Sequence, residues 1–577
     1  MIKYYLLSLF LGLWAISSGQ NKMYLKNGNI IDVVKGTVLK NQDVIIIDGK
    51  IESVGKTNKS FTTEGFKVID ATDQYILPGF TDPHIHFFQS GGLYTRPDAM
   101  DLRWKMPYEK ERKFVNDNVD DFLSRYLRCG VTTVVDVGGP MNNYTIRDSH
   151  AHADSLPRIY VTGPLISTVD REILNAGDPP IIKAKNAAEA LELVKKQLPF
   201  KPEFVKIWYV VTPEMSAESN FEIVKAVADE AHKNNIKLAV HAIELHTAKL
   251  ALKAGADMLV HSVQDSVIDD EFIALMLKRK VSLVPTLDVV NNYFKSFNRQ
   301  TIAETSNLRL ANPFSYGTLG DMETIPLEKI PEKSRKRITE AETFRKKYAH
   351  MDSVTHVNLK KLVKAGVNVA AGTDAGNIGT MHGPSFWTEL DIMKQAGLSD
   401  AEVLKTATLN AAMMLGKETI FGSVEKGKIA DLLIIDKNPL ENIQHVRDLK
   451  YIIRNGILME PDNIIKETTE QLVQRQLNAY NAGNIDEFMA TYSDSIVVYN
   501  HPNSVMLKGK ETMRKRYQEL FQKNPNQHCE LVNRIVQKNC VIDQERVTGR
   551  ADGKIVEAIA VYEIENKLIK NVYFIRK

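Results

Sequence analysis

Two histidines separated by one residue end an apolar run early in the chain. The stretch ILPGFTDPHIHFF covers residues 76–88 and contains His84 and His86. Side chains alternate between the two faces of a β-strand, so both imidazoles would point to one face, about 6.6 Å apart. Imidazole is the commonest metal ligand in proteins. The spacing therefore predicts a metal site, with two polar residues at a strand end as the alternative.

Other residues able to bind metal lie in later apolar runs. Lys206 lies in FVKIW, His241 in KLAVHA and His261 in MLVHSV, while Asp374 ends NVAAGTD. Nitrogen and oxygen donors of this kind suit zinc, although manganese, iron or cobalt can take the same ligands. If the ends of these runs meet in space, six side chains form one metal centre.

Eight short apolar runs alternate with helical stretches and are the elements that would position these side chains. Such alternation is typical of βα units and a parallel sheet. The predicted strands are residues 76–86 and the runs that begin at residues 132, 158, 204, 237, 258, 281 and 368. Eight of them predict an α/β fold, a (β/α)8 TIM-type barrel, whose chemistry lies at the C-terminal ends of the strands.

A second His-x-His pair tests how much the spacing alone means. His150 and His152 in SHAHAD precede the third predicted strand, and so belong at the opposite rim of the barrel. We expect them to be structural or exposed. Strand position is therefore needed in addition to spacing.

The barrel is predicted to occupy residues 76–420, between two β-rich flanks. Residues 22–75 and 421–462 share short strands and Asn-Gly pairs that favour hairpin turns, which predicts one composite β-sandwich made from both flanks. Residues 291–347 form a long polar segment before the last predicted strand. This segment is compatible with a lid over the site and with a solvent-exposed loop.

The motifs LPGFTDPHIH, FVKIW, AVHA, LVHS, AAGTDAG and GSVEKGKIADLLIID resemble the amidohydrolase superfamily, in its imidazolonepropionase-like branch with metal-dependent Xaa-Pro dipeptidases. The resemblance covers residues from about 22 to 460. It implies two divalent metal ions, with zinc expected. The implied metal ligands are His84, His86, Lys206, His241, His261 and Asp374. Lys206 would bridge both ions after carboxylation by carbon dioxide, because an ordinary lysine, with a pKa of about 10.4, is a cation.

The resemblance also implies a reaction. Two metal ions that bridge a water lower its pKa from about 15.7 towards about 7, which gives a metal-bridged hydroxide that attacks a C–N amide bond. Asp374 would be the catalytic residue that accepts the water's proton. Tyr209 and His382 are candidate substrate-binding residues. The expected substrate is a small-molecule amide, a dipeptide or N-acyl amino acid, with a cyclic amide or lactone as the alternative.

Residues 466–577 form a separate α+β region that resembles the SnoaL-like branch of the nuclear transport factor 2 fold, a cone of sheet and helices. The resemblance implies a module that holds a ligand or makes a homo-oligomer, and Asp494 and His501 are candidates to line its cavity. A ligand-binding sensor with a catalytically silent barrel is the alternative from another functional class.

The start of the chain predicts export. Residues 1–19 combine Lys3, a short apolar run and small residues, as in a secretory signal peptide. We therefore expect a periplasmic or secreted protein without a stable membrane anchor after cleavage. Three cysteines in 577 residues build no disulfide framework. A net charge of +3 gives no basic excess for nucleic acid.

Overall fold

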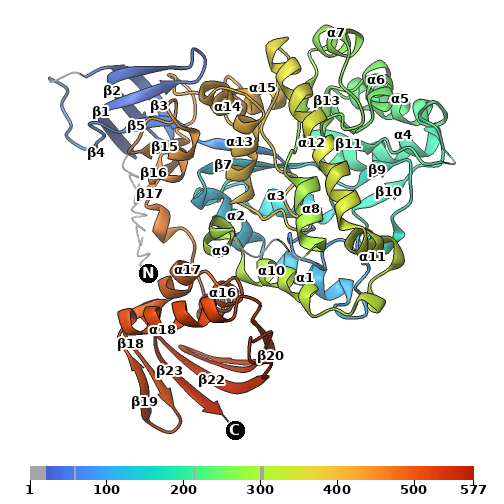
Figure 1. Ribbon diagram of the computed structural model, residues 1–577. Coiled ribbons are helices and arrows are strands. Elements are labelled where there is room, and N and C mark those ends of the chain that lie inside the picture. The colour runs from blue at the N-terminus through green and yellow to red at the C-terminus, as the bar shows by residue number, and fades with distance from the viewer. Residues whose placement is uncertain (1–20, 58–59, 214, 299, 301–303, 577) are drawn as a thin grey trace, which may run out of the picture.

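The computed structural model describes residues 21–57, 60–213, 215–298, 300 and 304–576 (Figure 1). The predicted signal peptide, residues 1–19, lies outside the described residues. Within the described part of the chain, no helix has the length and apolar character needed to cross a membrane.

The two flanks of the chain build one eight-stranded sheet. Its order is β17-β16-β15-β5-β1-β2-β3, and β4 pairs with β1. The strands are β1 (Lys22–Asp32), β2 (Thr37–Ile47), β3 (Lys50–Lys56), β4 (Lys67–Asp70), β5 (Tyr75–Pro78), β15 (Leu432–Ile435), β16 (Leu449–Arg454) and β17 (Ile457–Met459). The N-terminal and C-terminal flanks meet where β5 pairs antiparallel with β15.

One glycine separates this sheet from the central domain. The run predicted as a single strand, residues 76–86, is divided in the structure into β5 and β6 (Phe80–Ile85), with Gly79 between them. A Cβ atom at Gly79 would lie 2.3 Å from Thr132 Oγ1, closer than atoms can approach. Only glycine fits where the chain passes from one sheet to the next.

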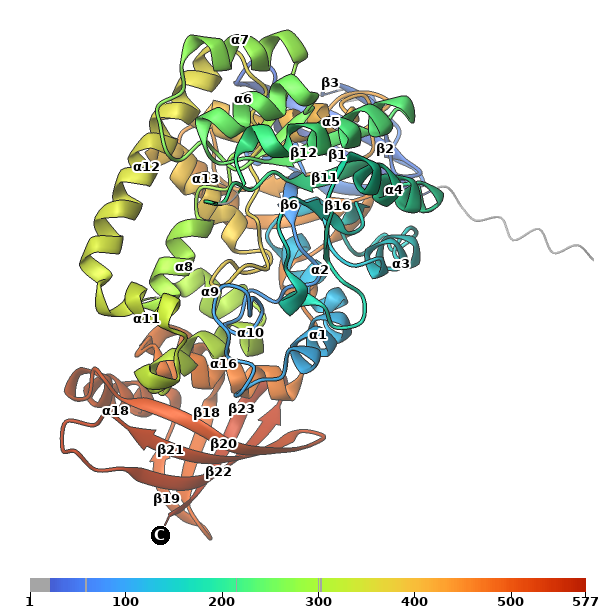
Figure 2. The same cartoon turned by 90° about the vertical axis from the view of Figure 1, so that its right-hand side faces the viewer.

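Parallel strands form the centre of the molecule. One sheet has the order β6-β7-β8 and another β10-β9-β11-β12-β13-β14. Their strands are β7 (Val131–Asp136), β8 (Arg158–Val161), β9 (Leu165–Ser167), β10 (Ile181–Lys183), β11 (Phe204–Trp208), β12 (Lys237–His241), β13 (Met258–Val260) and β14 (Ser282–Val284). Helices cover these strands, which is why the runs are apolar throughout instead of alternating (Figure 2).

The last predicted strand, from residue 368, is present as two isolated bridges. Val369 pairs parallel with Leu283 of β14, and Ala375 pairs parallel with Ile85 of β6. This segment thus connects the ends of the two parallel sheets. The run predicted from residue 158 is present as β8, and β9 follows it as a further strand.

The central domain carries fifteen helices among its described residues. They are α1 (Tyr108–Asp117), α2 (Val119–Arg128), α3 (Asn142–Ser149), α4 (Ala187–Gln197), α5 (Ala217–Lys233), α6 (Leu245–Ala254), α7 (Asp270–Arg279), α8 (Val289–Phe297), α9 (Thr305–Leu310), α10 (Pro313–Gly317), α11 (Glu332–Thr339), α12 (Ala341–Lys364), α13 (Ser385–Gln395), α14 (Asp400–Thr406) and α15 (Leu409–Leu415). The helices α8 to α11 belong to the long polar segment. Its apolar residues Phe297, Leu308 and Leu319 are buried in one core with Leu93 and Ile378, so the segment is not a solvent-exposed loop.

The C-terminal domain is a curved sheet with helices on one side. The sheet order is β19-β18-β23-β22-β21-β20. Its elements are α16 (Thr469–Asn481), α17 (Ile485–Ala490), β18 (Tyr492–Asn500), β19 (Ser504–Lys508), α18 (Lys510–Lys523), β20 (His528–Gln537), β21 (Cys540–Thr548), β22 (Val556–Glu565) and β23 (Leu568–Arg576). A capping box between Thr468 and Gln471 fixes the start of α16.

This domain packs against the central domain through the long segment. α16 packs on α10, and α16 and α17 contact α9 (Figure 1). The Asn478 side-chain amide donates to the Pro313 carbonyl at 2.7 Å. The Arg309 guanidinium donates to the buried Glu487 carboxylate at 2.6 and 3.1 Å. These hydrogen bonds to buried partners fix the position of the C-terminal domain on the central domain.

We predict that Arg309→Met weakens this interface. Glu487 is 1% exposed, so loss of its donor leaves a buried carboxylate less well paired and costs about 1–2 kcal/mol. Thermal unfolding and limited proteolysis between the domains measure the loss. Arg345→Met is the matched control, because Arg345 forms an exposed pair with Glu342 within one helix. Equal unfolding temperatures and equal cleavage rates in the two variants would contradict the prediction.

Candidate metal centre

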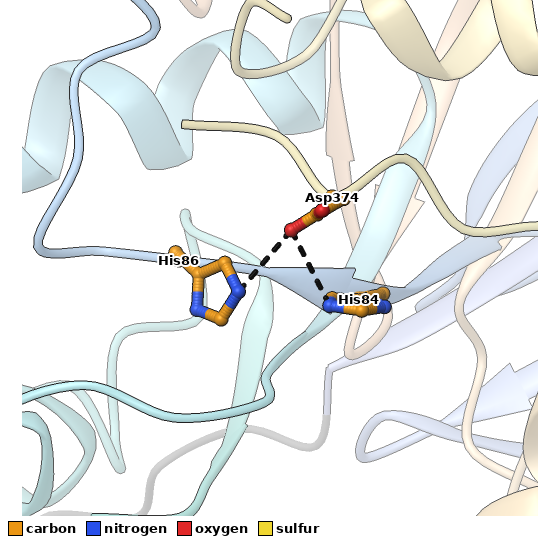
Figure 3. Close-up of side chains that lie close together, drawn as sticks. All are labelled: His84, His86 and Asp374. Carbon is orange, nitrogen blue, oxygen red and sulfur yellow. Dashed lines mark ion pairs between the residues drawn. The ribbon is translucent and has the colours of Figure 1, made fainter. Parts of the chain in front are cut away.

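His84, His86 and Asp374 form a compact buried group (Figure 3). Asp374 Oδ1 lies 3.3 Å from His84 Nε2 and 3.2 Å from His86 Nε2. One ligand atom from each residue lies within 4.8 Å of the others. Two imidazole nitrogens and a carboxylate at this separation match the ligands of a divalent metal.

Hydrogen bonds outside the cluster orient two of the imidazoles. His86 Nδ1 donates to the Gly138 carbonyl at 2.7 Å, which leaves Nε2 directed at Asp374. His261 Nδ1 lies 2.7 Å from Thr286 Oγ1. Metal-binding histidines are usually fixed in this way by a partner on the second ring nitrogen.

Left-handed backbone also occurs in this cluster. His261 has φ of 75° and Asp374 has φ of 58°, a region that residues with a Cβ atom rarely occupy. Such conformations persist only where the surrounding structure holds them, and they gather at functional sites. The backbone at two of the candidate ligands therefore carries strain.

The structure brings Lys206, His241 and His261 beside this group. The His261 ring centroid lies 5.0 Å from that of His84 and 4.6 Å from that of His241. Lys206 is 1% exposed, and its Nζ has no hydrogen-bond partner among the described residues. All six side chains named as metal ligands from the sequence thus converge at the ends of parallel strands.

Burial and nearby charges keep three of the imidazoles neutral. Burial, followed by the Lys206 charge, lowers the pKa of His241 to about 3. Burial with the same neighbour holds the pKa of His84 well below its ordinary value, and burial with His241 does so for His261. Burial also lowers the pKa of Lys206 to about 7. Neutral imidazoles have the free lone pair that metal coordination requires.

Two carboxylates that support the cluster escaped the sequence analysis. Asp82 accepts the Thr373 hydroxyl at 2.6 Å and the Thr373 amide at 3.1 Å, and so fastens the segment that carries Asp374. The Asp136 carboxylate accepts hydrogen bonds from two backbone amides. One belongs to Phe87, the residue after His86, and the other to Gly138, whose carbonyl contacts the His86 ring. Both residues lie at or near strand ends, in the motifs TDPHIH and VVDVG. This position was the only feature of the sequence that could have indicated their supporting role.

A cavity of about 330 Å³ opens onto the cluster. His86, His241, His261 and Asp374 line one part of it. The remaining lining residues are Arg96, Asp98, Ala99, Trp208, Ile243, Gln264, Val289, Val290, Tyr293, Arg337, Tyr348 and Asn377. This volume is at the small end of the range for sites that bind small molecules.

Tyr209 and His382, the predicted substrate contacts, do not line this cavity. The Tyr209 hydroxyl donates to the Ala217 carbonyl at 2.5 Å, and its neighbour Trp208 faces the cavity because adjacent strand residues point to opposite faces. His382 is buried, with Nε2 at 2.8 Å from the Gln89 carbonyl and Nδ1 at 3.0 Å from the Tyr126 hydroxyl. Both side chains have structural partners instead.

His150 and His152 lie away from the cluster, as predicted from their position. His150 follows α3, where Nδ1 contacts the Ile146 carbonyl and Nε2 pairs with Asp120. His152 is exposed.

Comparison with known proteins identifies relatives of both parts of the chain. Residues 473–572 match a model of the SnoaL-like domain. Ochratoxinase from Aspergillus niger is 22% identical over 72% of this chain and 82% of its own length. Imidazolonepropionase from Caldanaerobacter subterraneus is 25% identical over 72% of this chain and 88% of its own.

The fold has solved relatives as well. The crystal structure of a Xaa-Pro dipeptidase with bound methionine in the active site covers 76% of this chain and all of its own, with a TM-score of 0.56 and 23% identity. A model of the amidohydrolase family matches residues 75–510, about three quarters of the sequence. The last part of that match, from residue 469, lies in the C-terminal domain of the structure. The chain belongs to the amidohydrolase family.

Proposed function

We propose that the protein is an exported, binuclear metal-dependent amidohydrolase that cleaves a C–N amide bond of a small substrate, a dipeptide or N-acyl amino acid. The observation that carries this proposal is the buried group of His84, His86 and Asp374, with His241 and His261 beside it, at one end of a small cavity. We further propose that the two parallel sheets and the segment 368–375 close as a (β/α)8 barrel, with this cluster at the C-terminal ends of its strands.

The residues fit metal ions. His84 Nε2, His241 Nδ1 and Asp374 Oδ1 are buried without a hydrogen-bond partner among the described residues. Such atoms are costly unless something binds them. His84, His86 and Asp374 would hold one ion, and His241 and His261 a second, with zinc the metal that this donor set favours.

Lys206 would join the two sites. Its buried Nζ has no partner in the described part of the chain, which is unusual for a potential cation and appropriate for an amine that reacts with carbon dioxide. The resulting carbamate is an anion with two oxygens, able to bridge two ions. Lys206 Nζ forms no hydrogen bond with any described carboxylate, so the side chain is not neutralised by a direct carboxylate partner.

When bound, divalent ions polarise a substrate carbonyl and lower the pKa of water. Asp374 would then transfer the proton. Its Oδ1 faces His84 and His86, whereas Oδ2 lies 4.0 Å from His261 Nδ1. Oδ2 is thus the oxygen placed to receive a proton from water and to deliver it to the leaving nitrogen. Hydrolysis of a cyclic amide or lactone would use the same groups.

A second function is favoured for the C-terminal domain, which encloses a cavity of about 350 Å³. Tyr562 donates to Glu545 at 2.6 Å inside it, and buried Gln476 Oε1 has no described partner. We propose that this domain binds a small, mainly apolar ligand with a hydrogen-bonding group. Asp494 and His501 do not line the cavity, since both are exposed.

Removal of the first histidine pair should remove at least one metal ion. We predict that His84→Ala/His86→Ala lowers the metal content of the purified protein from two ions per chain to one or none, because two of three ligands to one ion are lost. His150→Ala/His152→Ala is the control with identical spacing at an unrelated place. Elemental analysis compares the two proteins, and unchanged metal content in the first would contradict the assignment.

Lys206 should determine the number of metal ions. We predict two ions per chain in the wild type and one or none in Lys206→Ala, with hydrolysis lowered at least 100-fold. Hydrolysis is measured with dipeptides, N-acyl amino acids, cyclic amides and lactones as candidate substrates. Lys183→Ala, an exposed lysine on β10, is the control. Full activity of Lys206→Ala would exclude the bridge, and a metal-loaded protein that hydrolyses nothing would exclude the enzyme.

The C-terminal domain should lose stability as the pH rises. Burial raises the pKa of Glu545 from 4.5 to about 7, so the folded state retains a proton that the unfolded state releases. Between pH 5 and pH 8 the free energy of unfolding should therefore fall, by up to about 3 kcal/mol. Thermal unfolding measured across this range tests it. Glu545→Gln should remove the dependence, whereas exposed Glu557→Gln should keep it.

A further inference from the structure

The charges that line the metal-centre cavity are unequally paired. Besides the candidate metal ligands, the cavity presents two guanidinium groups, Arg96 and Arg337, and one further carboxylate, Asp98. Which of the two cations is already neutralised decides what the cavity can bind.

Arg96 is fully engaged. Its Nε and Nη2 donate to the two Asp98 oxygens, each at 2.7 Å, and Nη1 donates to Asn377 Oδ1 at 2.6 Å. Although burial opposes ionisation, Arg96 and Arg171 hold the pKa of Asp98 below its ordinary value. A bidentate pair of this kind has little capacity left for a ligand. Arg96 therefore acts as part of the wall.

Arg337 has no such partner. It lies on α11, half-buried, and forms no ion pair with any carboxylate that the structure describes. Its guanidinium lies 5.6 Å from the centre of the Phe297 ring, which holds the side chain against the wall. A cation that lines a cavity and lacks an anion is placed to receive one from a ligand.

The wall between Arg337 and the metal cluster is aromatic and apolar. Trp208, Tyr293 and Tyr348 line it together with Ile243 and Val289. The guanidinium groups of Arg96 and Arg171 each lie 5.8 Å from the centre of the Trp208 ring and help to hold it in place. The Tyr293 hydroxyl donates to Asn377 Oδ1 at 2.7 Å. Fixed rings of this type favour an apolar or aromatic side chain.

The size of the cavity links these features to one ligand. A volume of about 330 Å³ accommodates a single small molecule. A carbonyl at the metal cluster, an apolar group against the rings and an anion at Arg337 must then belong to the same molecule. N-acyl amino acids and dipeptides combine these three groups, whereas simple neutral amides and lactones lack the anion.

We propose that Arg337 binds the free carboxylate of the substrate, so that the enzyme selects acylated amino acids with an apolar side chain over neutral amides. This inference rests on the proposed function, because it names the substrate class of the same cavity. Arg337 is a specificity residue contributed by the long segment between β14 and residue 368, not by a strand end.

The test uses two compounds that differ only in the carboxylate. N-acetyl-L-phenylalanine and N-acetyl-2-phenylethylamine share the acetamide bond and the phenyl ring. The zinc-loaded full chain should prefer the first, with a kcat/KM about 30-fold higher, the value of one hydrogen-bonded charge pair. Arg337→Gln should remove that preference mainly through KM. Arg337→Lys should restore part of it.

A control on the same helix separates charge recognition from general damage. Arg335→Gln removes an arginine of α11 that does not line the cavity, and should leave the preference intact. Isothermal titration of both compounds gives a readout that does not depend on turnover.

The outcomes distinguish the two proposals. Equal rates with both compounds, or a preference that survives in Arg337→Gln, would overturn the role of Arg337 while leaving the hydrolase intact. Binding that favours the carboxylate through Arg337 without any hydrolysis would sustain this inference and refute the proposed function. Neither hydrolysis nor preferential binding would refute both.

Discussion

The architecture depends on a set of buried polar groups that the protein alone does not satisfy. His84, His241, Lys206 and Asp374 each direct at least one atom into the interior without a hydrogen-bond partner among the described residues. Isolated buried polar atoms oppose folding, and a chain retains several together only where a ligand satisfies them jointly. The parallel strands, the strained backbone at His261 and Asp374, and the supporting carboxylates Asp82 and Asp136 all position this set.

The ligand cluster could be predicted from sequence because strand periodicity and strand order are local signals. His84, His241 and Asp374 lie at the ends of apolar runs, and parallel strands bring such ends to one edge. The same logic excluded His150 and His152. Tyr209 was predicted as a substrate contact, but its neighbour Trp208 lines the cavity instead. Adjacent residues along a strand point to opposite faces, so only one of the two faces the cavity.

The rest of the cavity could not be predicted, because its residues are distant in sequence and follow no period. Arg337 comes from the long polar segment and Tyr348 from α12 just after it, and the packing of both depends on tertiary contacts alone. Likewise, Glu545 is revealed as a cavity residue only by the closure of the C-terminal sheet, whereas the more conspicuous Asp494 is exposed. The C-terminal domain also rests on α9 and α10 of this segment, so one stretch of chain forms both a cavity wall and a domain interface.

The position of β5 has a consequence for the order of assembly during synthesis. β5 lies between β1 and β15, and Gly79 and β6 follow it directly to His84 and His86. Until the ribosome has made residues 432–435, one edge of β5 is unpaired. The first two candidate metal ligands, His84 and His86, are among the earliest residues made, yet the strand before them gains its second neighbour among the last residues of the hydrolase domain. The cluster of candidate ligands is therefore completed late in the synthesis of the chain.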